Sequence, residues 1–123
     1  MFRYLLVATG GMIGAVARYW LSGVASTLSS RFPYGTLLVN LVGCFIIGAF
    51  LTLAYERFNW SPDLRIFFVV GFLGAFTTFS AFSYETVSLL REGTYAYAVL
   101  NMAASLFGCL AATILGIVIV KKI

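Results

Sequence analysis

Residues 71–85 read GFLGAFTTFSAFSYE, an apolar stretch that also carries features opposing a continuous helix. Gly71 and Gly74 are poor helix formers, and the Thr and Ser hydroxyls between residues 77 and 83 can divert backbone hydrogen bonds. We therefore expect a helical segment that breaks near residues 74–79. A continuous helix that is merely rich in small residues is the alternative.

The composition around this segment excludes several classes of protein. The chain has 123 residues, of which 62% are hydrophobic and 10% charged, and it has no His. Soluble domains contain about 45–50% apolar and about 25% charged residues. This composition excludes a disordered chain and argues strongly against a soluble domain. The net charge of +4 is scattered, so no nucleic-acid-binding patch is expected. An enzyme is poorly supported, because no nucleophile–base pair or metal-ligand cluster is visible.

Long segments with few charges indicate membrane helices, because spanning a bilayer takes ~20 largely apolar residues. The sequence predicts an all-α integral membrane protein whose single domain, residues 1–123, has four spans at about 4–29, 34–55, 65–90 and 95–120. A cleavable signal peptide is the alternative for the first span, but the glycines at 10, 11 and 14 and the apolar residues beyond the cleavage point disfavour it.

The distribution of Lys and Arg predicts the orientation of these spans. One side would hold Arg3, Arg57, Arg65, Lys121 and Lys122, and the other Arg31 and Arg91, with Arg18 if it snorkels that way. This favours cytoplasmic termini. The margin is small, so it is compatible with insertion in both orientations.

Polar and small residues recur every four positions in two of the predicted spans, which puts each set on nearly one helix face. The sets are Thr36, Asn40, Cys44, Gly48 and Thr52 in the second span, and Asn101, Ser105, Cys109 and Thr113 in the fourth. They form either interhelical packing contacts or a continuous polar path. The Asn40 amide either bonds a neighbouring helix or donates to a permeating anion. We expect the two cysteines to be small interior residues, because no zinc spacing exists.

The expected helix break would expose chemistry of two kinds. Freed backbone carbonyls are ready oxygen ligands for a cation, as in discontinuous transporter helices. Phe76, Phe79 and Phe82 recur every three residues beside the break. They either face lipid and core or offer their positive ring edges to an anion. Ring edges would bind an anion weakly enough to release it, as conduction requires.

Two charged residues fall within or close to the spans. Arg18 either attracts anions to a vestibule or snorkels from its helix. We expect Glu85 near the membrane edge, past the break.

Three strings together resemble the fluoride channel family called Fluc or CrcB. They are GGMIGAVARY at 10–19, GTLLVN at 35–40 and GFLGAFTTFSAFSYE at 71–85. The resemblance covers essentially the whole chain and implies a passive, fluoride-selective channel of the cell membrane, which lets microbes expel fluoride. It also implies an antiparallel, dual-topology homodimer with two pores.

The resemblance also implies roles for individual residues. Asn40 would donate to fluoride, and Phe79 and Phe82 would form a ladder of ring edges. Ser80 and Thr113 would belong to a polar track beside the rings, and Arg18 would lie in a vestibule. Backbone carbonyls of Gly74 and Thr77 would hold a structural sodium ion (Na+) at the dimer axis.

Two other classes compete with a channel. A proton-coupled multidrug transporter of four spans needs a carboxylate deep in the membrane, for which Glu85 is the only candidate. A membrane scaffold that transports nothing is the third possibility. It predicts that Asn40 and Phe79 can be changed without altering any ion flux.

Overall fold

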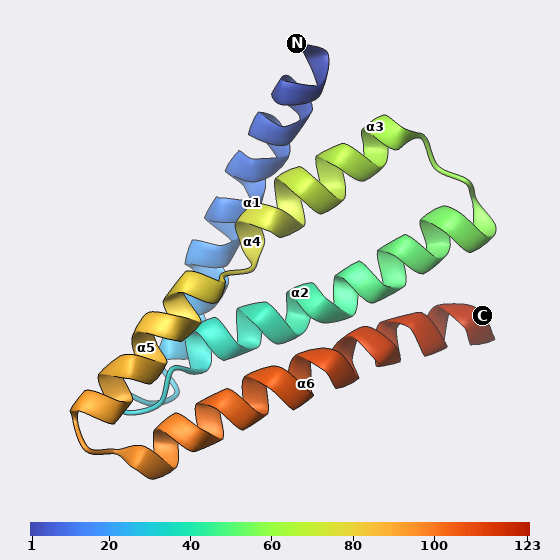
Figure 1. Cartoon of the computed structure of the whole chain (residues 1–123). Coiled ribbons are helices and arrows are strands. Elements are labelled where there is room, and N and C mark those ends of the chain that lie inside the picture. The colour runs from blue at the N-terminus through green and yellow to red at the C-terminus, as the bar shows by residue number, and fades with distance from the viewer.

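The computed structural model describes residues 1–123 as helices joined by short links, with no strand. In chain order the elements are α1 (Phe2–Ser26), α2 (Tyr34–Thr52), η1 (Leu53–Arg57), α3 (Pro62–Arg65), η2 (Ile66–Leu73), α4 (Gly74–Phe76), α5 (Phe79–Arg91) and α6 (Tyr95–Lys122). The elements η1 and η2 are π-helical turns that continue α2 and α3 without interruption. Figure 1 shows the resulting arrangement of long rods.

Four helical segments are long and apolar enough to cross a membrane, as the sequence predicts. They are Phe2–Ser26, Tyr34–Arg57, Pro62–Arg91 and Tyr95–Lys122. The first ends before the predicted residue 29, because Ser and Thr hydroxyls bond the backbone there. Thr27 Oγ1 donates to the Val24 carbonyl at 2.7 Å, and Ser29 Oγ accepts the Arg31 N–H at 3.1 Å. Such local bonds compete with the helical ladder.

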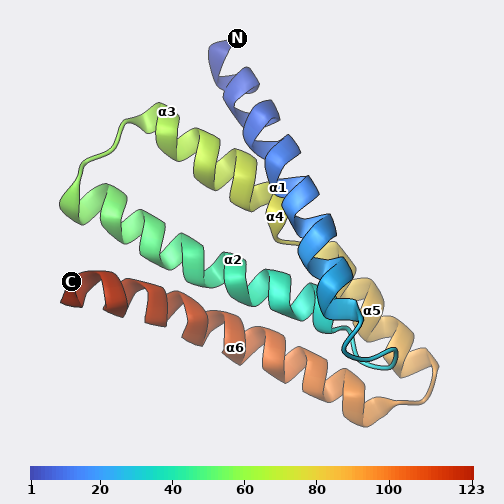
Figure 2. The ribbon, with the colours of Figure 1, turned by 180° about the vertical axis from the view of Figure 1, so that it is seen from behind.

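The long helices pack as two close pairs, α1 with η2 and α2 with α6. In both ribbon views α6 runs beside α2 along most of its length (Figures 1 and 2). Glycine permits this approach: a Cβ at Gly48 would collide with the Thr113 carbonyl, and one at Gly116 with the Phe45 carbonyl. Small residues at such contacts let membrane helices pack backbone against backbone. The relative position of α2 and α6 is thereby fixed.

The third span breaks at Thr77 and Thr78, inside the predicted interval. Thr77 has φ −81° and ψ 157°, and Thr78 has φ −150° and ψ 117°, so both residues are extended. Figure 1 shows the extended link between α4 and α5. The Thr78 hydroxyl caps α5 by accepting the Ala81 N–H at 3.3 Å. The third span thus consists of two half-helices joined by an extended link.

Only a small core is buried within one chain. Val39, Leu73 and Phe76 form its centre. The rings of Phe68, Phe72 and Phe76 stack along η2 and α4 with centroids 5.2 and 5.7 Å apart. Of 123 residues, 20 are buried, so most of the apolar surface is covered by something other than this chain itself.

Both termini lie at the same end of the bundle as the link between η1 and α3. Arg3 forms an ion pair with Asp63 (Nε to Oδ1, 3.5 Å), and Lys121 with Glu56 (Nζ to Oε1, 3.1 Å). An even number of spans requires this arrangement. The two ion pairs tie the ends of the chain to the same loop region.

Candidate functional site

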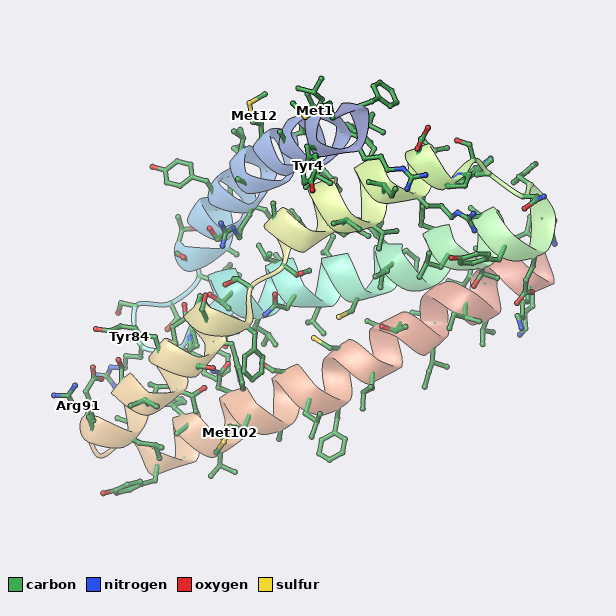
Figure 3. The ribbon with its side chains drawn as sticks, turned by 45° about the horizontal axis from the view of Figure 1, so that its top comes forward. Met1, Tyr4, Met12, Tyr84, Arg91 and Met102 are labelled. Atoms are coloured by element: carbon green, nitrogen blue, oxygen red, sulfur yellow. The ribbon has the colours of Figure 1, made fainter.

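A cleft of about 670 Å³ lies between α2, the helix break and α6. It brings together five of the residues that the sequence singles out: Asn40, Gly74, Thr77, Phe79 and Phe82. Ser105, a largely buried residue of α6, also lines it, as does Met102, which Figure 3 labels. None of the residues that line the cleft is charged. Aliphatic side chains such as Ile47, Leu73 and Leu106 also line it, so an occupant meets apolar groups, dipoles and aromatic rings but no fixed charge.

The Asn40 side chain holds the extended backbone of the break. Its Nδ2 donates to the Thr78 carbonyl at 3.0 Å, and its Oδ1 accepts the Thr78 N–H at 2.9 Å. One amide therefore satisfies both backbone groups of a residue that lies outside any helix. Asn40 has a second amide hydrogen, which makes no hydrogen bond within the chain. The Asn40 amide thus bonds the extended link between α4 and α5, and one donor remains.

The break also removes helical partners from two backbone carbonyls. In a continuous helix the Thr78 N–H would bond the Gly74 carbonyl, and the Ala81 N–H would bond the Thr77 carbonyl. Here the Thr78 N–H bonds Asn40 Oδ1 at 2.9 Å, and the Ala81 N–H bonds the Thr78 hydroxyl at 3.3 Å. The diverted carbonyls belong to the two residues from which the resemblance implies sodium ligands. Neutral carbonyl oxygens of this kind fit a hard cation.

Phe79 and Phe82 stand one turn apart at the start of α5, with ring centroids 5.3 Å apart. Phe79 is 77% exposed in the single chain. Phe76, which precedes it in the three-residue repeat, is 4% exposed. The break separates them, so Phe76 joins the core and only the other two rings line the cleft.

Ser80 and Thr113 lie outside the cleft. The exposed Ser80 hydroxyl is 3.2 Å from the Thr78 hydroxyl, at the N-terminus of α5. The Thr113 hydroxyl donates to the carbonyls of Cys44 and Cys109, both at 3.1 Å, and so bridges α2 and α6. In the single chain, Thr113 acts in helix packing.

A second cavity of about 220 Å³ lies between α1, α2 and the break. Arg18, Ser22, Thr36 and Thr78 line it, so Thr78 borders both cavities. Beside it the Thr36 hydroxyl donates to Glu85 Oε1 at 2.6 Å, while Oε2 is buried without a partner. The sequence pattern does not predict this link, although Thr36 is the first residue of the polar row on α2. By contrast, Tyr84 and Arg91 point away from the bundle (Figure 3).

The residues of the polar row on α6 also serve two purposes: some join neighbouring helices and others line the cleft. Asn101, 1% exposed, donates from Nδ2 to Thr86 Oγ1 at 2.9 Å and joins α6 to α5. Ser105 is the member of that row that reaches the cleft together with Cys109. The four-residue spacing places Ser105 in the row but predicts no separate role for it. Its position one turn before Cys109 was the available signal.

Four spans, a discontinuous third helix and an uncharged cleft beside it define a small multi-pass membrane protein. Comparison with known sequences identifies its family. Residues 5–117 match the family model described as CrcB-like protein, Camphor Resistance (CrcB), and the chain belongs to this family. It is therefore a multi-pass integral protein of the cell membrane, and it is not an enzyme.

Curated relatives align with the chain over nearly its full length. A protein of Rhizobium etli (strain CIAT 652) named fluoride-specific ion channel FluC is 45% identical, over 100% of this chain and 99% of that protein. Proteins with the same name from Geobacter sulfurreducens and Magnetococcus marinus are 44% and 48% identical. The Geobacter alignment covers 100% of this chain and 100% of that protein. The Magnetococcus alignment covers 95% of this chain and 96% of that protein.

Proposed function

We propose that this protein is a passive, fluoride-selective ion channel through which the cell exports fluoride. The observation that carries the proposal is the cleft, which combines the free Asn40 donor and two phenylalanine rings with no charged residue. A fixed cation there would retain an anion, and conduction needs binding weak enough to release it. The full-length relatives named fluoride-specific ion channel support the choice of ion.

Fluoride is small and strongly hydrated, so its water shell must be replaced by close donors. The second N–H of Asn40 is one donor, and the positive ring edges of Phe79 and Phe82 are others. The first-turn N–H groups of α5 have no intrahelical partner, and the helix dipole there favours an anion. Ser80 and Thr113 would extend this polar track, and Arg18 would draw anions toward the vestibule formed by the second cavity.

The functional unit is a homodimer. Gly74, Phe79 and Ser80 are exposed in the single chain, directly at the extended backbone of the break. Irregular backbone at membrane depth persists only where protein or a polar cavity covers it. A second copy of the chain supplies that cover. The small Lys and Arg bias of the sequence supports an antiparallel, dual-topology pair, whose symmetry gives two pores.

The carbonyls of Gly74 and Thr77 would hold a structural sodium ion where the two copies meet. Both carbonyls have lost their helical N–H partners, and both residues line the cleft. When bound, the cation adds positive potential near an uncharged anion path and links the subunits.

A proton-coupled multidrug transporter is not favoured. Such a mechanism needs a carboxylate within the substrate path, and the cleft contains none. Glu85 lies outside the cleft and accepts a hydrogen bond from Thr36.

Efflux from liposomes tests the proposal. Vesicles containing the purified protein are loaded with fluoride or chloride at matched gradients, without a proton gradient. We expect rapid loss of fluoride and retention of chloride. Equal loss of both ions, loss of neither, or fluoride loss only with a proton gradient would overturn the proposal.

A further inference from the structure

The chain has two cysteines, and the fold brings them together. Cys44 on α2 and Cys109 on α6 are both free, and both line the large cleft. They are 65 positions apart in sequence (109 − 44) and meet only because α2 packs on α6.

The surrounding contacts fix this pair in position. The Thr113 hydroxyl donates to the carbonyls of Cys44 and Cys109, both at 3.1 Å, so one side chain ties down both cysteine backbones. One turn further along, Gly48 lies against the Thr113 carbonyl. A ligand that binds both cysteines would therefore meet two backbones whose relative position is already fixed, which lowers the entropic cost of binding.

We propose that Cys44 and Cys109 form a two-thiolate site for a soft metal cation of the Hg²⁺, Ag⁺ or Cu⁺ type. Thiolates select soft metals, whereas a structural zinc site needs four ligands. No group of three or more His, Cys, Asp or Glu side chains stands close enough together to complete a zinc site. Two sulfurs suffice for the linear coordination that these soft cations accept.

Uncharged mercuric chloride is a suitable probe, because it enters lipid. In the binding reaction two Hg–Cl bonds break and two Hg–S bonds form. The two thiol protons leave with the two chlorides, and no electrons are transferred. The product is a covalent bridge between α2 and α6 in the wall of the cleft. On the proposed function, we expect this bridge to stop fluoride efflux.

The metal stoichiometry tests the site without reference to ion flux. The full-length protein, reduced and purified in detergent, is titrated with mercuric chloride, washed with a monothiol and assayed for bound mercury and free thiols. We expect one mercury per chain and no remaining free thiol. Two mercury ions per chain, one on each sulfur, or none retained after the wash would overturn the site. A mercury-linked dimer on a non-reducing gel would show that the bridge joins two chains, which also contradicts the proposal.

Variants then assign the ligands. Cys44→Ser and Cys109→Ser each leave one thiol, and we expect both to lose mercury to the monothiol wash. Ser105→Ala is the matched control, because it changes the same cleft wall but keeps both thiols, so its mercury should be retained. Retention by either cysteine variant would contradict a two-thiolate site. The wild-type stoichiometry decides the matter if a variant does not fold.

Fluoride efflux before and after metal separates the site from its effect. We expect efflux to fall at least tenfold with one mercury per chain and to return with an excess of dithiol. Unchanged efflux with one mercury bound per chain would refute the expected inhibition of efflux but would be consistent with the two-thiolate site. Protein that binds mercury as expected but never conducts fluoride would overturn the proposed function instead.

Discussion

Replacing Asn40 with Asp tests the centre of the proposed pathway. The change keeps the size of the side chain and one oxygen that can accept the Thr78 N–H, which lies 2.9 Å from Asn40 Oδ1. It removes the N–H that donates to the Thr78 carbonyl at 3.0 Å, as well as the second N–H assigned to fluoride. It also adds a negative charge to a cleft that has none.

The electrostatic effect on an anion is large. Two unit charges ~4 Å apart at an effective dielectric constant of ~20 interact by about 4 kcal/mol. Because 1.4 kcal/mol is a factor of ten, fluoride occupancy beside the introduced carboxylate should fall roughly 1,000-fold. The Thr78 carbonyl loses its donor, which should lower the free energy of unfolding by about 1–3 kcal/mol.

Initial fluoride efflux from liposomes, normalised to the amount of folded protein, measures the effect of Asn40→Asp. Asn101→Asp is the matched control, because Asn101 is a buried amide that lines neither cavity. We expect the control to lose stability but to conduct within about tenfold of wild type. Asn40→Asp efflux within a factor of about three of wild type would refute the assignment of Asn40 to the path.

Three further changes have definite expected outcomes. Phe79→Ile or Phe82→Ile should reduce fluoride efflux by about tenfold or more without changing the elution volume on gel filtration. Phe107→Ile, at a residue 68% exposed outside the cleft, should leave efflux unchanged, and normal conduction by both cleft variants would rule out the ring edges. Gly48→Val would force a side chain into the Thr113 carbonyl and should lower the free energy of unfolding by about 1–3 kcal/mol, measured as a lower melting temperature in detergent. An unchanged melting temperature would contradict the close α2–α6 contact. Arg18→Gln should lower efflux most at low ionic strength, because long-range attraction is screened by salt; an effect independent of salt would exclude steering.

The sequence predicts those features of the fold that depend on local composition. Four apolar segments give four spans, and the Gly and Thr residues near Thr77 locate the break. The three-residue phenylalanine repeat does not by itself separate core rings from cleft rings, because the break falls between Phe76 and Phe79 and interrupts the helical periodicity. Phe76 therefore lies in the core, while Phe79 is exposed.

The contacts between distant residues could not be predicted in this way. Asn40 and Thr78 are 38 positions apart. The sequence indicates that the Asn40 amide is a candidate site residue but does not indicate that Thr78 is its partner. Thr36 meets Glu85 across 49 positions. Such pairs depend on how two helices pack, which a single sequence does not specify.

The ion pairs of Arg3 with Asp63 and of Lys121 with Glu56 put both termini at one end of the bundle. A gene fusion that joins two copies through a short linker would therefore start the second copy on the face where the first one finished, and both would insert with the same polarity. An inverted tandem pair requires one additional hydrophobic crossing in the linker. Single-chain versions of an antiparallel dimer would thus need nine membrane crossings rather than eight.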